Sequence, residues 1–137
     1  VIGATTTGAA KQRGLLSRID CQVLVVEEAA EVLEAHLLAS MLPSTRHAIL
    51  IGDHQQLRPG TAVHQLSTQY NMEISLFERL LINGLPFSTL LLQHRMLPIL
   101  TATIVRPYFY KNLRDAESVH AYPQVLGMAK NLFFWAH

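Results

Sequence analysis

Two adjacent carboxylates follow a short apolar run in the first quarter of the chain. Glu27 and Glu28 come directly after Val23-Leu24-Val25-Val26. At a strand end, one carboxylate can hold a Mg²⁺ ion while its neighbour polarises a water for attack on a phosphoryl group. A helix whose acidic first turn suits the helix dipole is the alternative. These residues alone leave both interpretations open.

A second polar cluster, Gly52-Asp53-His54-Gln55-Gln56-Leu57-Arg58-Pro59, follows another apolar run. The amide of Gln56 could contact a γ-phosphate there and help to orient the attacking water. An ordinary Gly-Asp turn with solvated glutamines explains the same residues equally well.

Two further clusters offer a cation and a set of hydroxyls. Arg95, in Gln93-His94-Arg95-Met96-Leu97-Pro98, could stabilise charge on a transferring phosphate, or lie on the surface before a helix that starts at proline. Thr5-Thr6-Thr7 could contact a nucleic-acid backbone, or cap a helix.

Alternating strands and helices are expected to position these clusters. Apolar, β-branched runs predict strands, and helically spaced leucines and alanines predict helices. The strands are expected at residues 1–4, 22–26, 48–51, 90–93 and 132–135, and the helices at 29–41, 74–81 and 99–110, the last ended or kinked by Pro107. This order predicts an α/β fold with a mainly parallel sheet, whose strand 22–26 is buried on both faces. In such sheets, function gathers at the carboxyl ends of strands.

Composition excludes several classes of protein. Of 137 residues, 50% are hydrophobic and 15% charged, which excludes a disordered chain, and the net charge of +1 gives no global signal for nucleic acid or membrane. No apolar stretch is long enough to span a bilayer. Cys21 is the single cysteine, so no internal disulfide can form and a reducing interior is expected. A chain that starts at Val1, without a signal peptide, is expected to be a piece of a longer protein.

Taken together and in this order, the clusters resemble the motifs of superfamily 1 helicases. Val25–Ala30 resembles motif II (Walker B), Gly52–Pro59 resembles motif III, Gln93–Pro98 resembles motif IV, and Thr5–Ala10 occupies the place of motif Ic. Within the superfamily, the chain resembles the group of the nonsense-mediated-decay helicase. More narrowly, it resembles helicases that carry NFX-type zinc fingers, in the segments EEAAEVLEAH, GDHQQLRP and SLFERL.

The resemblance implies a P-loop NTPase (RecA-like) parallel sheet. Residues 1–88 would be the C-terminal part of the first motor domain, and residues 89–137 the start of the second. It also implies an ATP-dependent helicase motor that couples hydrolysis to movement on single-stranded or viral RNA. Such a protein would act in cytoplasmic antiviral RNA surveillance.

The resemblance further implies a role for individual residues. Glu27 would hold Mg²⁺ and Glu28 would be the general base, while Gln56 and Arg95 would reach the γ-phosphate of ATP. Gln93 and His94 would join Arg95 in binding the nucleotide. The RNA strand would lie along Thr5, Thr6, Thr7 and Pro59. Two residues depart from the family pattern: Glu27 stands where aspartate is usual, and His94 where relatives have tyrosine.

The chain contains no Gly-x-x-x-x-Gly-Lys-Ser/Thr phosphate loop. We therefore expect these 137 residues by themselves to be inactive as an ATPase. The alternative function is a helicase-like scaffold that binds RNA without significant ATP turnover, which the Glu27 departure favours.

Overall fold

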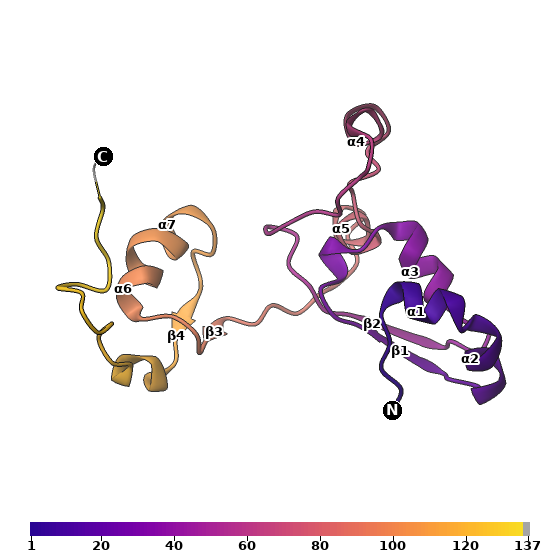
Figure 1. Cartoon of the computed structure of the whole chain (residues 1–137), viewed down its shortest axis with the longest axis horizontal. Helices are drawn as coiled ribbons and strands as arrows, with labels where there is room; N and C mark the ends of the chain where they lie inside the picture. Colours follow the sequence, from indigo (N-terminus) through magenta and orange to yellow (C-terminus); the bar gives the residue numbers. More distant parts are fainter. Residues whose placement is uncertain (136–137) are drawn as a thin grey trace. The chain divides into compact units, whose positions relative to one another are not determined.

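The computed structural model describes residues 1–135, which belong to two compact units, Val1–Phe87 and Ser88–His137. Figure 1 shows the elements of each unit, which are described separately below. The assignment of residues 1–88 and 89–137 to two motor domains stays a prediction. Among the described residues, no helix has the length and apolar character needed to cross a membrane.

The first unit is built around two parallel strands. β1 (Val23–Val26) pairs with β2 (His47–Leu50), with Val26 opposite Leu50. The connection between them carries η1 (Ala29–Glu31) and α3 (Glu34–Ser40), as parallel strands require a crossover. The predicted strands at 22–26 and 48–51 and their parallel arrangement are therefore confirmed.

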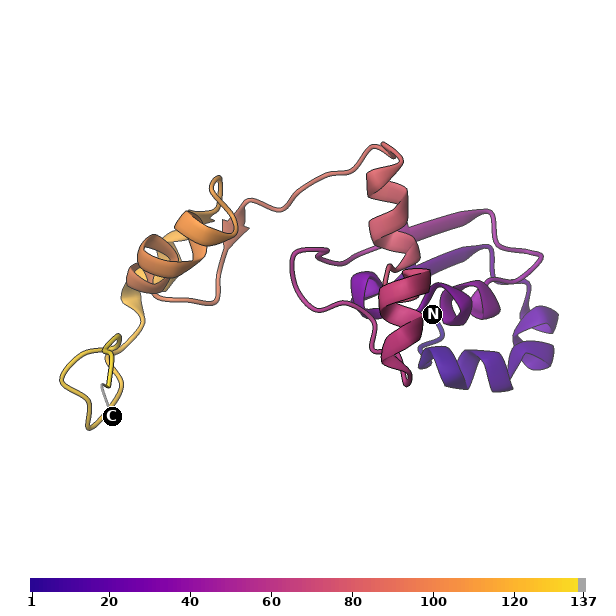
Figure 2. The same cartoon turned by 90° about the horizontal axis from the view of Figure 1, so that it is seen from above.

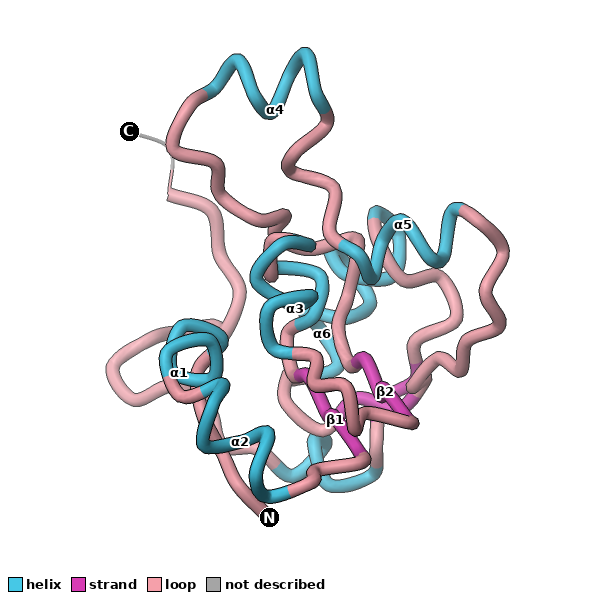
Figure 3. Tube along the Cα trace, turned by 90° about the vertical axis from the view of Figure 1, so that its right-hand side faces the viewer, coloured by secondary structure: helices cyan, strands magenta, loops and turns pink. Residues whose placement is uncertain are grey.

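The core of this unit lies on one face of the β1–β2 pair. Leu24, Val26 and Leu50 pack against Leu37 of α3 and Leu76 of α5 (Leu76–Ile82). Both helices lie on the same side of the strands in Figures 1 and 3. Side chains alternate between the two faces of a strand, and those on the face opposite the two helices are about half exposed. The prediction of a strand buried on both faces is therefore wrong. That exposed face carries Val23, Val25, Ile49 and Ile51.

Two helices precede the sheet, where a strand at residues 1–4 was expected. α1 (Thr6–Lys11) and α2 (Arg13–Ile19) follow residues without regular structure, and α1 lies beside α3 in Figure 2. The Thr5 hydroxyl caps α1 by accepting a hydrogen bond from the Gly8 amide at 3.0 Å. The strand prediction at 1–4 is wrong, since these residues lead into the capped helix α1 and both sheets of residues 1–135 are formed by other segments.

The helix predicted at residues 29–41 is interrupted. Between η1 and α3 the backbone of Val32 and Leu33 is extended. The Ala29 amide donates to the carbonyl of Ile51 at 2.8 Å. This hydrogen bond holds the backbone of Ala29 against the residue that follows β2. Tertiary contact at the sheet edge thus overrides the helix propensity of the alanines.

The remainder of the first unit contains one missed and one confirmed helix. α4 (His64–Tyr70) was not predicted, and it ends at Asn71, which has a φ of 52°. α5 confirms the helix expected at 74–81. Its N-cap is Ser75, whose hydroxyl accepts from the Glu78 amide at 3.1 Å.

The second unit also has two parallel strands and a helical connection. β3 (Leu92–Gln93) pairs with β4 (Arg114–Asp115), and a helical run between them consists of α6 (Pro98–Leu100), the π-helix η2 (Thr101–Val105) and α7 (Arg106–Tyr108). The strand expected at 90–93 and most of the helix expected at 99–110 are confirmed. Pro107 has no amide hydrogen to donate, and the helix accommodates it with a π turn rather than a break.

The end of this unit differs from the prediction. β4 and η3 (Glu117–Ala121) were not anticipated, and residues 132–135 form no strand. An apolar run at 132–135 has no strand beside it in the described part of the chain, so its β propensity is not used.

Candidate functional site

The paired acids and the Gly-Asp turn meet at the carboxyl edge of β1 and β2. The Ile51 amide donates to the Val26 carbonyl at 2.9 Å, and the Ile51 carbonyl accepts from Ala29. A Cβ atom at Gly52 would lie 2.9 Å from the Ala30 nitrogen, closer than real contacts allow. Only glycine permits this backbone approach. The structure therefore brings two of the sequence clusters together through their backbones.

Glu27 and Glu28 are exposed, and neither carboxylate forms a hydrogen bond or ion pair with another described residue. Glu28 has φ 51° and ψ 39°, a left-handed conformation that costs a non-glycine residue about 1–2 kcal/mol. The two acids precede a three-residue 3₁₀ helix instead of opening an α-helix. Glu27 and Glu28 therefore do not form the acidic first turn of an α-helix that was considered above, and ligand contact by them stays a prediction.

Gln56 is fixed within the Gly-Asp turn by its side chain. Its Nε2 donates to Oδ2 of Asp53 at 2.7 Å, while Oδ1 of Asp53 accepts from the Gln55 amide at 3.0 Å. The second contact is an Asx turn. Gln56 is exposed, and its amide oxygen accepts no hydrogen bond from the described residues. It can therefore present an acceptor to a water molecule.

Arg58 anchors the same loop to α5 and was not predicted as a site residue. It makes two hydrogen bonds to the buried carboxylate of Glu78, from Nε at 3.1 Å and from Nη2 at 2.5 Å, and Nη1 reaches Glu73 at 3.2 Å. The hydrogen bonds to Glu78 raise the pKa of Arg58. Glu73 also accepts from the hydroxyl of Ser67, and this contact, helped by Arg58, lowers the pKa of Glu73. No sequence spacing signals this cluster, because its members come from the loop, α4, α5 and the segment between them.

The residues expected to contact RNA differ in exposure. Pro59 is buried, so contact with a polymer would require the loop to open. Thr5 uses its hydroxyl as the α1 cap, whereas Thr6 is half-buried and Thr7 is exposed on α1. The capping alternative is confirmed for Thr5, and RNA contact at all four positions stays a prediction.

In the second unit, Gln93 is buried at the end of β3, and its side chain organises the following loop. Oε1 accepts from the amides of Arg95 and Met96 at 2.8 and 2.7 Å. Nε2 donates to the Met96 carbonyl at 2.8 Å and to Asp115 Oδ1 at 2.7 Å. With its amide satisfied internally, Gln93 supports the loop, and direct nucleotide contact by it stays a prediction.

Arg95 and His94 are exposed in that loop. The guanidinium of Arg95 has no hydrogen-bond or ion-pair partner among residues 1–135. The His94 carbonyl accepts from the Tyr122 hydroxyl at 2.6 Å, which leaves its imidazole outside this contact. Both side chains are therefore available to a ligand.

Asp115 is the buried carboxylate beneath the loop. It accepts from Gln93, from the Thr101 hydroxyl at 2.7 Å, and from the guanidinium of Arg106. Burial opposes its ionisation, but the hydrogen bonds from Gln93 and Thr101 and the charge of Arg106 outweigh burial and lower the pKa of Asp115. The carboxylate is thus held ionised as a structural group.

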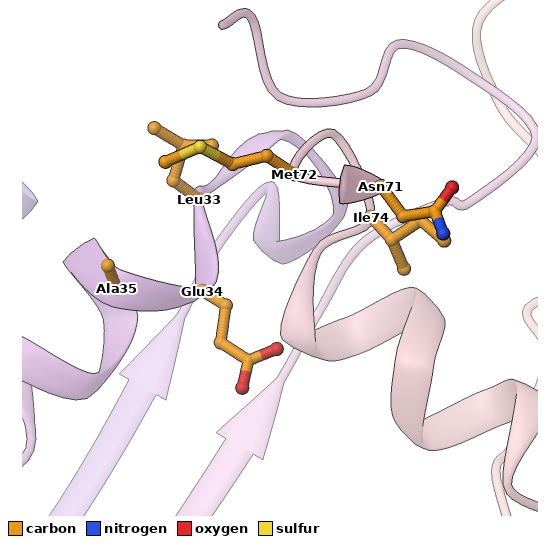
Figure 4. Close-up of a pocket in the computed structure, with 6 residues that line it drawn as sticks. All are labelled: Leu33, Glu34, Ala35, Asn71, Met72 and Ile74. Carbon is orange, nitrogen blue, oxygen red and sulfur yellow. The ribbon is translucent and has the colours of Figure 1, made fainter. Parts of the chain in front are cut away.

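A shallow pocket of about 250 Å³ lies elsewhere in the first unit and contains none of the predicted site residues. Figure 4 shows its lining residues, with the Glu34 carboxylate directed toward α5. Two hydrogen bonds from Arg79, at 2.6 and 2.8 Å, lower the pKa of Glu34. The ion pair with Arg79 accounts for the position of the Glu34 carboxylate, so no ligand is needed to explain it. The pocket is lined by Leu33, Glu34, Ala35, Asn71, Met72 and Ile74.

No group of three or more His, Cys, Asp or Glu side chains could hold a metal within the described residues. Mg²⁺ does not need such a cage, because it commonly binds through one or two carboxylates together with water and substrate phosphates. The carboxylate oxygens of Glu27 and Glu28, which have no partner among the described residues, fit that limited donor set.

Comparison with known proteins identifies a family for the segment that contains this sheet edge. The family described as an AAA domain matches residues 1–63, which include β1, β2 and the edge where the two clusters meet. The chain is 53% identical over 137 residues to "NFX1-type zinc finger-containing protein 1 homolog" of Caenorhabditis elegans, covering 100% of the chain and 6% of that protein.

Two further relatives extend the comparison. "Regulator of nonsense transcripts 1" of Caenorhabditis elegans is 34% identical over 101 residues, covering 74% of the chain and 9% of that protein. "Putative ATP-dependent RNA helicase ECM32" of Saccharomyces cerevisiae is 33% identical over 136 residues, covering 96% of the chain and 11% of that protein.

The chain belongs to the superfamily 1 helicases, in the group related to the nonsense-mediated-decay helicase. Within that group, it is similar over its whole length to the NFX1-type zinc finger-containing proteins. Because the chain spans 6% of the length of its NFX1-type relative, activity, substrates and partners of a whole protein are proposals.

Proposed function

We propose that the full-length protein carrying this chain is an ATP-dependent motor that moves on single-stranded RNA, built on RecA-like sheets. The observation that carries the proposal is the close approach of Gly52 to Ala29 and Ala30. It brings the segment of Glu27 and Glu28, whose carboxylates have no partner among the described residues, beside the Gln56 loop. The name of the yeast relative, "Putative ATP-dependent RNA helicase ECM32", supports ATP and RNA as the ligands.

In this proposal each exposed group has a defined task. Glu28 accepts a proton from the attacking water, and Gln56 uses its open amide oxygen to orient that water. Arg95 stabilises negative charge on the transferring phosphate. Mg²⁺, held by Glu27, would supply charge neutralisation at the phosphates.

The test is RNA-stimulated phosphate release by the full-length protein. Glu28→Gln should lower kcat by about 100-fold to 10,000-fold, the range for loss of a general base, while ATP still binds. Glu31→Gln is the matched control, because Glu31 is an exposed acid three residues away on η1 and forms no ion pair within the described residues. Equal activities of the Glu28 and Glu31 variants would contradict the proposal.

A scaffold that binds RNA without significant ATP turnover is the second candidate, favoured by the longer side chain of Glu27. Glu27→Asp restores the residue usual in superfamily 1 helicases. A gain of tenfold or more in kcat from this variant would support the scaffold (about 1.4 kcal/mol of barrier). An unchanged or lower kcat would support the motor.

Three finer statements belong to the same proposal. The 137-residue chain by itself should not hydrolyse ATP, since it contains no phosphate loop. Magnesium-dependent hydrolysis by the purified chain that Glu28→Gln abolished would contradict this.

A role in antiviral RNA surveillance in the cytoplasm rests on the family resemblance. Cross-linking of the protein to viral RNA in infected cells and microscopy of the tagged protein would test it.

A further inference from the structure

The loop that carries Arg95 is held by one side chain rather than by a ladder of backbone hydrogen bonds. β3 contributes two residues to its sheet, and the chain then bends at Arg95 and Met96. Gln93 spans this bend, since its oxygen accepts from two successive amides and its nitrogen donates back to the Met96 carbonyl. The backbone of Arg95 is therefore positioned through the Gln93 amide.

Asp115 reinforces the orientation of that amide. An amide can be flipped by exchanging its oxygen and nitrogen, which would turn two donors toward the amides of Arg95 and Met96. The ionised carboxylate of Asp115 accepts only, so it fixes the nitrogen of Gln93 on its own side at 2.7 Å. Thr101 and Arg106 hold Asp115 in turn from the helical run.

The side chains at the two ends of this chain of contacts differ in exposure. Gln93 and Thr101 are buried, and the Asp115 side chain is 8% exposed, whereas Arg95 is exposed. No buried side-chain polar atom in the described residues lacks a partner. A base whose buried polar side-chain atoms all have partners thus supports Arg95, whose guanidinium has no partner among the described residues.

We propose that Gln93 and Asp115 are positioning residues that set the place of Arg95 for transition-state stabilisation. This inference rests on the role given to Arg95 under Proposed function. It assigns Gln93 a task other than nucleotide binding, and it adds Asp115, Thr101 and Arg106 to the machinery.

The primary test replaces Gln93 by glutamate in the full-length protein. Glutamate has nearly the same shape and can accept from the amides of Arg95 and Met96. It cannot donate to the Met96 carbonyl, and it places a second negative charge beside Asp115. Single-turnover hydrolysis should slow tenfold or more with little change in the KM for ATP, because positioning acts on the transition state. Asn112→Asp, an amide-to-acid change at an exposed position of the same unit, is the matched control and should not slow it.

Two further measurements separate positioning from folding. In an Arg95→Ala background, Gln93→Glu should cost less than twofold, because the group it positions is gone. When Gln93→Glu is combined with Asp115→Asn, the asparagine amide can donate to the glutamate carboxylate, so the hydrogen bond is restored in the opposite direction. This double variant should recover at least part of the lost rate. Hydrogen exchange of residues 98–108 shows whether each variant retains its fold.

Each outcome decides the matter. If Arg95→Ala itself leaves hydrolysis unchanged, the proposed function of Arg95 fails and the positioning role fails with it. If Arg95→Ala slows hydrolysis but Gln93→Glu has no effect, or has the same effect in both backgrounds, only the positioning role is overturned. If Gln93→Glu unfolds the unit, Thr101→Val, which removes one donor to Asp115, takes its place in the same cycle. Thr101→Val should then slow hydrolysis at least threefold when Arg95 is present and have no such effect in the Arg95→Ala background. Equal rates with and without Thr101→Val in the protein that retains Arg95 would overturn the inference.

Discussion

The loops after β2 and after β3 carry comparable clusters but are held in opposite ways. After β2, backbone meets backbone, with Gly52 against Ala29 and Ala30. After β3, a buried side chain, Gln93, ties successive amides to a carboxylate. The first loop therefore depends on the absence of a side chain, and the second depends on the chemical identity of one.

The carboxylates of the two regions differ in exposure and in the number of their hydrogen-bond partners. Glu27 and Glu28 are exposed and unpaired within the described chain, whereas Asp115 is buried and accepts from three side chains. An acid available for chemistry and an acid used for structure can thus be distinguished by their partners. Glu78, buried and bonded twice by Arg58, belongs to the second kind.

The largest effect on folding is expected at Gly52. Gly52→Ala places a Cβ atom 2.9 Å from a backbone nitrogen that cannot rotate away. The local stability of the sheet edge should fall by about 2–3 kcal/mol, the upper part of the range for overpacking. Hydrogen exchange should speed up at residues 27–31 and 51–56 and stay unchanged at 93–97.

Gly60→Ala is the control for this change, since nothing lies within 4 Å of a Cβ at that position and its φ is not in the left-handed region. Equal exchange in the two variants would show that the backbone contact does not hold the first loop.

A smaller effect is expected at Arg58. Arg58→Ala leaves the carboxylate of Glu78 buried without its cation and should cost about 1–2 kcal/mol, because the exposed side of Arg58 is already screened by water. The measurement is exchange in α5 together with kcat, which should fall severalfold as the Gln56 loop loosens. Arg46→Ala, an exposed arginine with no side-chain partner in residues 1–135, should change neither. Loss of exchange protection without any loss of kcat would separate Arg58 from the catalytic loop.

The smallest effect is a pH dependence confined to the second loop. The pKa of Asp115 is lowered in the fold, so its stabilising contribution is present above the ordinary aspartate value of about 3.9 and is lost as the pH falls through the lower folded value. Exchange at Arg95 and Met96, corrected for intrinsic rates, should therefore accelerate at acid pH. Asp115→Asn should abolish this acid-dependent step, and an identical pH profile in that variant would assign the step to another group.

Much of the architecture follows from local sequence. The β-branched runs around Val25 and Ile49 indicated parallel strands, and the helically spaced leucines of residues 74–81 indicated α5. Strong, regular patterns survive because local preference and tertiary packing agree there. Where they disagree, the prediction failed. Residues 132–135 have β propensity but no neighbouring strand in the described chain, and the helix predicted from Ala29 is interrupted at Val32 and Leu33.

Residue types and their order determined the family and named the polar clusters, because those features are written along the chain. Only the tertiary structure decided how each cluster is held. The clamp of Arg58 on Glu78 joins residues 20 positions apart, and that of Asp115 on Gln93 joins residues 22 apart. Hydrogen bonds of this kind depend on distance and direction in space, and sequence spacing outside regular helices and strands carries neither.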